Sequence, residues 1–186
     1  MAATTLDHLV VASRTLEEGA AWMEAKLGVS VAGGGKHALM GTHNRLLKLD
    51  QRRYLEVIAI DPDAPAPGRA RWFELDAPAM KARLENGPAL IHWVERTADL
   101  ESELRTYPGA VEILSFTRGP YRWRMGLARD GSFPANGKAA TLIQWEGGLH
   151  PWDALPETGV RLADFDRTAV PLRATFATPS GTRTIP

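Results

Sequence analysis

Two stretches of the chain share one hydrophobic pattern. Leu6 to Val11 is a short run of apolar residues with His8 at its third position, and Leu90 to Glu95 repeats that run with His92 in the same place. Short apolar runs rich in Leu, Val and Ile predict strands that are buried on both faces. A small hydroxyl residue and helically spaced apolar residues follow each run, so the pattern predicts a strand and then a helix, twice.

The first helix is predicted from Thr15, which stands at capping-box spacing from Glu18, to Gly28, which ends a helix without a Cβ clash. Extended segments are expected at 38–41, 44–49 and 54–60. The Gly33-Gly34-Gly35 run between helix and strands is interpreted as a loose turn, since three glycines weaken any regular element. It lacks the spacing of a phosphate loop.

The second copy has the same order, after a proline-rich connection at 61–68 and a short helix near 78–85. A helix is expected over 97–106, strands at 111–117, 121–127 and 140–146, then a strand at 160–165 and a final hairpin of 172–178 with 182–185. The sequence therefore predicts an α+β fold of two tandem βαβββ modules with a C-terminal β-hairpin extension. The ranges are 1–61 for the first module, 62–88 for the linker, 89–150 for the second module and 151–186 for the extension.

Charge and composition reduce the number of possible function classes. Over 186 residues, 22 basic and 22 acidic side chains give a formal net charge of zero, which disfavours nucleic acid and anionic membranes as partners. No apolar run approaches the ~20 residues of a spanning helix, and the N-terminus lacks the pattern of a secretory signal, so a cytoplasmic location is expected. With no cysteine, any metal must be held by nitrogen or oxygen ligands.

Polar residues inside the predicted apolar strands are the candidate functional residues. Tyr54, Glu56 and Ile58 share one face of a strand, where an unpaired carboxylate would be costly to bury. Glu56 therefore calls for a cation, a metal or a hydrogen-bond donor, and the same reasoning applies to His8, His92 and Gln144. The alternative for each histidine is a hydrogen-bonded core residue. His37 and His43 are interpreted as turn or rim residues, and His150 as part of the exit from the last strand.

Three motifs resemble a known family: Leu-Asp-His-Leu-Val-Val-Ala at 6–12, Met-Gly-Thr-His-Asn-Arg-Leu-Leu at 40–47 and Tyr-Leu-Glu-Val-Ile-Ala-Ile-Asp at 54–61. They are similar to the glyoxalase-like domain proteins of the vicinal oxygen chelate superfamily. The resemblance implies that the two modules curl into a cup-shaped incomplete barrel. That cup is built within one chain or across a homodimer, and both arrangements stay open.

The resemblance also implies a metal site and an activity. It places His8, Glu56, His92 and Gln144 as metal ligands, with Glu56 as the catalytic base, although many members have glutamate where this chain has Gln144. Zinc, nickel, cobalt, manganese and ferrous iron all suit such a set. The expected substrate is a small molecule bound through two oxygens, and the expected chemistry is that of an isomerase, lyase or dioxygenase. A metal-free protein that binds or sequesters small molecules in the same cup is the rival. The expected pocket residues are His43, Asn44, Arg45, Tyr54, Trp123 and Trp152.

Overall fold

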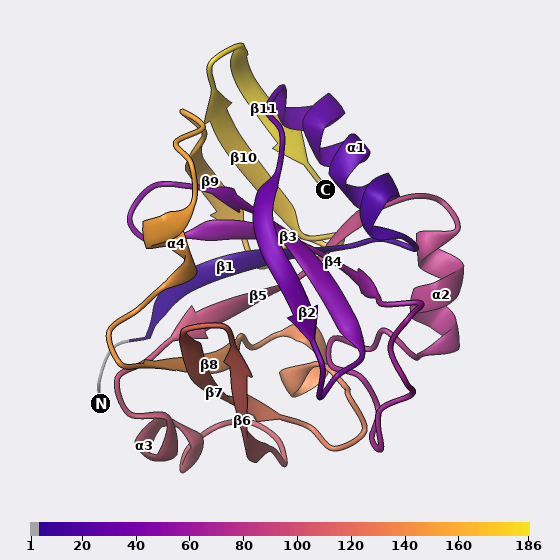
Figure 1. Ribbon diagram of the computed structural model, residues 1–186, viewed down its shortest axis with the longest axis vertical. Helices are drawn as coiled ribbons and strands as arrows, with labels where there is room; N and C mark the ends of the chain where they lie inside the picture. The colour runs from indigo at the N-terminus through magenta and orange to yellow at the C-terminus, as the bar shows by residue number, and fades with distance from the viewer. Residues whose placement is uncertain (1–3) are drawn as a thin grey trace.

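A computed structural model describes residues 4–186, and it contains two copies of a βαβββ unit (Figure 1). The first copy comprises β1 (Thr5–Ala12), α1 (Leu16–Leu27), β2 (Ala32–His37), β3 (Thr42–Lys48) and β4 (Tyr54–Ile60). The second comprises β5 (Ala89–Arg96), α3 (Leu100–Leu104), β6 (Glu112–Arg118), β7 (Tyr121–Leu127) and β8 (Thr141–Glu146). Helix α2 (Pro78–Leu84) lies between the copies, and the 3-10 turn η1 (Pro134–Gly137) precedes β8. The predicted α+β fold is confirmed, while the exact domain boundaries stay a prediction.

One chain supplies both modules of a single eight-stranded sheet, in the order β2-β3-β4-β1-β5-β8-β7-β6. Within each module the first strand pairs in parallel with the fourth, and the antiparallel pairing of β1 with β5 joins the modules. The edge strands β2 and β6 contact each other although they are farthest apart in the strand order. The sheet is therefore curled into an almost closed cup.

The two faces of the sheet bury separate cores, as strand alternation requires. On the outer face, Leu9, Val11 and Val57 pack beneath α1 and the C-terminal strands. On the inner face, Val10 and Ile58 pack with aromatic residues of the connection between the modules. The inner face of the cup is thus partly filled by a segment that belongs to neither βαβββ unit.

The C-terminal extension contains the three strands that were predicted, and the strand expected at 160–165 pairs with the predicted hairpin. After the short helix α4 (Pro151–Ala154), the strands β9 (Arg161–Asp166), β10 (Arg173–Thr178) and β11 (Gly181–Ile185) form a separate antiparallel sheet (Figure 1). Its fully buried Phe176 joins the outer core. No helix among residues 4–186 is both long and apolar enough to cross a membrane.

The glycine run is part of strand β2, and the turn falls at 38–41, where a strand was expected. A register shift between Ala32 and Gly35 absorbs the positive φ angles of the glycines. At Gly34 an added Cβ would lie 2.0 Å from the backbone oxygen of Asn44. The entropy cost of the glycines is thus offset by a close approach of β2 to β3 that a side chain would prevent. Helix α3 is also shorter than the predicted 97–106.

Gly34→Ala should destabilise the protein, because Gly34 has φ +90 and its Cβ would overlap a backbone atom. The left-handed backbone alone costs about 1–3 kcal/mol for a non-glycine residue. Urea unfolding should show at least that loss. Gly68→Ala is the matched control, since nothing lies within 4 Å of its Cβ position. Equal stability of the two variants would contradict the close approach.

Candidate functional site

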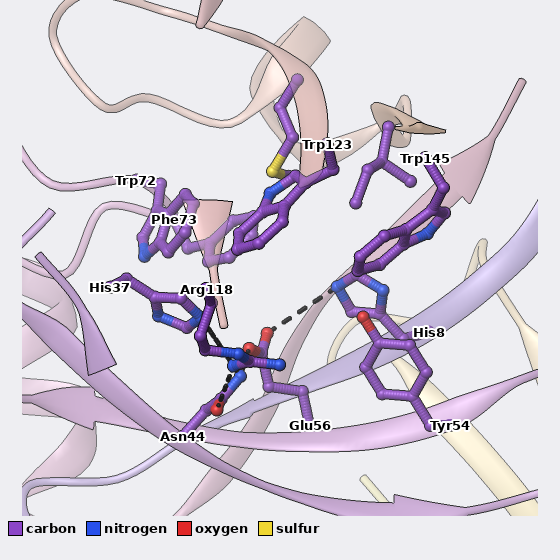
Figure 2. Close-up of a pocket in the computed structure, with 12 residues that line it drawn as sticks. His8, His37, Asn44, Tyr54, Glu56, Trp72, Phe73, Arg118, Trp123 and Trp145 are labelled. Carbon is purple, nitrogen blue, oxygen red and sulfur yellow. Dashed lines mark hydrogen bonds and ion pairs between the residues drawn. The ribbon is translucent and has the colours of Figure 1, made fainter. Parts of the chain in front are cut away.

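The inner face of the cup holds a narrow, mostly aromatic pocket (Figure 2). Its cavity volume is only about 20 Å³, roughly the space of one water molecule. Both modules and the connection between them contribute to the wall. The lining residues are His8, His37, Asn44, Tyr54, Glu56, Trp72, Phe73, Arg118, Trp123, Met125, Ile143 and Trp145.

His8 is held in one orientation by its neighbour Asp7. Its Nδ1 lies 2.7 Å from Asp7 Oδ1, and Tyr54 stacks on the ring with the centroids 4.5 Å apart. A β-bulge between Leu6 and His8 interrupts the alternation of β1, which accounts for consecutive side chains meeting. Because a carboxylate only accepts, Nδ1 donates to Asp7, and Nε2 is the ring nitrogen that faces Glu56.

The carboxylate of Asp7 is fully buried and accepts hydrogen bonds from three rings. Besides His8, Trp145 Nε1 and His150 Nε2 each donate to Oδ2 over 3.1 Å. His150 is itself fixed as the N-cap of α4, where its Nδ1 accepts from the backbone N–H of Trp152. Burial alone would raise the pKa of Asp7, but the hydrogen bonds from His150 and His8 outweigh burial and hold that pKa well below its usual value. Asp7 is therefore ionised.

Glu56 is the carboxylate that faces His8 across the pocket. Its Oε1 accepts from Asn44 Nδ2 over 2.6 Å, and its Oε2 lies 3.7 Å from His8 Nε2. That separation is too long for a direct hydrogen bond. The side chain is only 5% exposed, so Oε2 faces a nearly dry space. A carboxylate oxygen and an imidazole nitrogen thus converge on one point of the pocket.

A second polar group stands beside Glu56, at the edge where β2 meets β6. Asn44 Oδ1 accepts from Arg118 Nη1 over 2.8 Å and from the Gly35 N–H over 3.0 Å. Arg118 Nη1 also lies 3.2 Å from His37 Nε2, whose Nδ1 contacts Thr42 Oγ1. Burial, and next the charge of Arg118, lower the pKa of His37 to about 3. His37 is therefore a neutral acceptor that holds Arg118.

The pairing of β1 with β5 relates the two modules by an approximate two-fold axis. Leu9 lies opposite Trp93 at the centre of this pairing. On one side of this central pair His8 lies opposite Val94, and on the other side His92 lies opposite Val10. His92 is thus the counterpart of His8, as the sequence repeat indicated.

The same relation gives Glu56 a different counterpart from the expected one. Glu56 lies opposite Val10 in the first module, and Thr141 lies opposite Val94 in the second. Thr141 Oγ1 is 2.9 Å from His92 Nε2, which also accepts the backbone N–H of Thr141. The second module therefore repeats the histidine but replaces the carboxylate by a hydroxyl.

Gln144 does not face the pocket. Its side-chain oxygen accepts from the Leu100 N–H at the start of α3 and from Arg124 Nη2. Because Ile143 and Trp145 line the pocket, alternation turns Gln144 to the opposite face of β8. The expected pairing of Gln144 with Glu56 is corrected to Thr141 with Glu56.

His92 is separated from the pocket by Phe73 of the connection between the modules. The two rings lie 5.6 Å apart, and Phe73 lines both the pocket and a smaller cavity that Thr141 lines. Phe73 and Glu74 have φ +57 and +56, a left-handed conformation that is strained for bulky residues. The Glu74 N–H donates to Gly131 O and holds this conformation in place.

The donors present do not fit the four-ligand metal site that the resemblance implies. Within residues 4–186, no group of three or more His, Asp or Glu side chains is placed to hold a metal ion. His8 and Glu56 face each other, whereas His92 lies behind Phe73 and Gln144 lies on the other face. Sites for zinc use three or four protein ligands, and non-haem iron sites use two histidines and a carboxylate, so His8 and Glu56 beside the Arg118 cation do not make such a site.

Of the other predicted pocket residues, the structure brings Asn44, Tyr54 and Trp123 to the wall but not the remaining three. Asn44 faces the pocket from β3, so alternation directs His43 and Arg45 to the opposite face. Trp152 instead packs under Lys48, whose Nζ lies 3.9 Å from the ring centroid.

Sequence reasoning missed Asp7, His37, Trp72, Phe73, Arg118 and Trp145. For His37 a signal existed, because the hairpin that joins β2 to β3 brings it next to the predicted Asn44. For Trp72 and Phe73 no periodic pattern was present to find them.

The sequence model of a family described as glyoxalase-like domain matches residues 6–178. This chain belongs to the glyoxalase-like domain family. The resemblance found in the three sequence motifs is thereby confirmed for nearly the whole glyoxalase-like chain. No functionally curated protein matches it.

Solved structures share the glyoxalase-like fold at low identity. A hypothetical protein from Staphylococcus aureus is 16% identical with a TM-score of 0.51, over 77% of this chain and 59% of that one. A hypothetical protein from Bacillus halodurans C-125 is 12% identical with a TM-score of 0.50, over 80% and 97%. Methylmalonyl-CoA epimerase from Mycobacterium tuberculosis is 17% identical with a TM-score of 0.46, over 75% and 85%. These likenesses show the fold alone.

Asp7→Asn should destabilise the protein by about 3–5 kcal/mol, because an amide cannot accept from all three rings and leaves a donor buried without a partner. Chemical denaturation measures the loss. Asp153→Asn is the control, since its ion pair with Arg52 is half exposed and worth at most about 1 kcal/mol. Similar stability of the two variants would contradict the central role of Asp7.

Acidification below pH 6.5 should destabilise the protein through its buried histidines. Burial and then the charge of His8 lower the pKa of His92 to about 3, and the pKa of His37 is lowered equally, from the usual 6.5. Between those values the unfolded chain binds more protons than the folded one, so the free energy of unfolding falls as pH falls. His92→Gln should reduce that slope by about 1 kcal/mol per pH unit. An unchanged slope between pH 6.5 and 5 would contradict the neutral buried histidine.

Proposed function

We propose that this protein is an enzyme that moves a proton on a small carbonyl compound, with Glu56 as the base. The observation that carries the proposal is the position of Glu56 Oε2, 3.7 Å from His8 Nε2 in a narrow pocket. A carboxylate oxygen and an imidazole nitrogen at one point suit the removal of a proton from a carbon atom next to a carbonyl group.

In the proposed reaction, the C–H bond next to the carbonyl breaks and its proton passes to Glu56 Oε2. The bonding electrons form an enolate, whose charge the nearby Arg118 guanidinium offsets. Return of the proton to the same or a neighbouring atom yields an isomer, so that no oxidant or reductant is needed. Asp7 keeps His8 Nε2 free to share the proton with Glu56.

This proposal keeps the isomerase chemistry that the family resemblance implies and assigns no step to a metal. The His8 and Glu56 pair supports it, because the same two side chains that were expected as ligands suffice for proton transfer. Lyase chemistry would start from the same enolate, whereas a dioxygenase would need an iron centre, which the donor set does not fit.

A metal-free binding or sequestering protein is the second candidate. The aromatic wall favours it, because Trp72, Trp123 and Trp145 offer flat apolar surface to a ligand whether or not a reaction follows. The two candidates differ in one property, since only the enzyme requires a carboxylate at position 56.

Solvent exchange tests the proposal. Pyruvate, 2-oxobutyrate and phenylpyruvate are incubated with the protein in D2O, and loss of the proton next to the carbonyl is followed by NMR. Glu56→Gln should slow the catalysed exchange by roughly 10²- to 10⁴-fold, the usual contribution of a general base. Glu146→Gln, on an exposed end of β8, is the matched control and should leave the rate unchanged.

Two results would overturn this proposal. If all three oxo acids exchange their protons no faster with the protein than in buffer alone, the binding protein is favoured, particularly when the compounds still bind. Exchange that disappears on treatment with a chelator and returns with zinc, nickel, cobalt, manganese or ferrous iron favours the metal-dependent enzyme instead.

A further inference from the structure

Arg118 is a half-buried cation in the pocket wall that has no anionic partner in the described chain. It ends β6, and its guanidinium lies beside His37, the last residue of β2, and beside Asn44 (Figure 2). Within residues 4–186, no carboxylate oxygen lies within 4.0 Å of its guanidinium nitrogens. By contrast, the half-buried Arg69, Arg71 and Arg124 each pair with a carboxylate.

Part of the guanidinium group is committed to the protein and part is free. Nη1 contacts Asn44 Oδ1 and His37 Nε2, which are neutral acceptors. Neither Nε nor Nη2 donates to any atom of residues 4–186. These donors belong to a side chain that lines the pocket, where a planar fork of N–H groups matches the two oxygens of a carboxylate.

The guanidinium is held in place before any ligand binds. Gly35 makes room for it, because a Cβ there would lie 2.9 Å from Arg118 Cδ. The guanidinium carbon lies 5.9 Å from the ring centroid of Trp123, within range of a cation–π contact. A positioned donor loses little conformational entropy on binding, which favours a specific contact over a diffuse one.

Asn44 fixes the distance between this cation and the proposed base. Its oxygen accepts from Arg118 over 2.8 Å, and its nitrogen donates to Glu56 Oε1 over 2.6 Å. Arg118 and Glu56 are therefore one amide group apart. A carboxylate bound to Arg118 places the next atoms of its molecule beside Glu56, while the amide keeps the two anions separate.

We infer that Arg118 binds the carboxylate of the substrate and thereby determines the substrate class. That class is a small carboxylic acid whose acidic C–H lies within two bonds of the carboxylate. Because the free space of the pocket is only about 20 Å³, a flat apolar body on this acid enters between the tryptophans of the wall by moving their side chains apart. The statement of the C–H position rests on the proposed function. Recognition of the carboxylate does not, because it requires only Arg118 and the pocket.

Binding of unreactive probes tests this inference separately from catalysis. Phenylacetate and its neutral isostere phenylacetamide are titrated by calorimetry and by tryptophan fluorescence. The protein should prefer phenylacetate, and Arg118→Met should weaken phenylacetate binding about 10- to 100-fold, the usual effect of losing a charge-assisted hydrogen bond, with little change for phenylacetamide. Arg118→Lys should recover only part of the affinity, since an ammonium lacks the fork. The exposed Arg122→Met is the matched control and should bind like the original protein.

Glu56→Gln separates the two proposals. Removal of the second anion should leave phenylacetate affinity unchanged or raise it, even though proton exchange is lost. When phenylacetate binding depends on Arg118 but no oxo acid exchanges its proton, the carboxylate site stands and the proton-transfer function fails. Three results would overturn the carboxylate site. They are equal affinity for the acid and the amide, undetectable binding of both compounds, and normal phenylacetate binding by the Arg118→Met variant.

Discussion

The buried carboxylate of Asp7 is the constraint on which the pocket depends. A full negative charge without water is tolerated only where donors surround it, and here three rings from separate parts of the chain supply them. Trp145 comes from the last strand of the second module, and His150 comes from the segment that follows it. The charge therefore couples the orientation of His8 to the folding of distant elements, and an error in any of them would leave a donor or the carboxylate unpaired.

The two modules have the same strand order and the same histidine, but only the first has a carboxylate facing that histidine. In the first, Glu56 faces His8 across open space, whereas in the second, Thr141 bonds directly to His92. The direct bond leaves no room for a ligand between the two side chains, and Phe73 separates them from the pocket that Glu56 lines. A cup that could hold a symmetric four-ligand centre is thereby divided into a functional half and a structural half.

The sequence predicted the strands well because each strand pattern is local. Alternation and capping need only neighbouring residues, which is why β4 and α1 were found, as was the correspondence of His8 with His92. The register between β5 and β8 is set by tertiary packing, so the counterpart of Glu56 was assigned to Gln144 instead of Thr141. The position of Phe73 could not be predicted from the sequence for a related reason. Its left-handed backbone depends on a contact with Gly131, which is far away in the chain.

The glycines of β2 show how an apparent weakness of the sequence supports the site. Gly34 lets β2 approach the backbone of Asn44, and Gly35 leaves space for the side chain of Arg118. Both effects act on the same amide, because the N–H of Gly35 and the guanidinium of Arg118 donate to the oxygen of Asn44. With its oxygen occupied by two donors, Asn44 must direct its N–H group toward Glu56. The orientation of the proposed base thus follows from residues that have no side chain, and a strand of better β-forming residues could not have provided it.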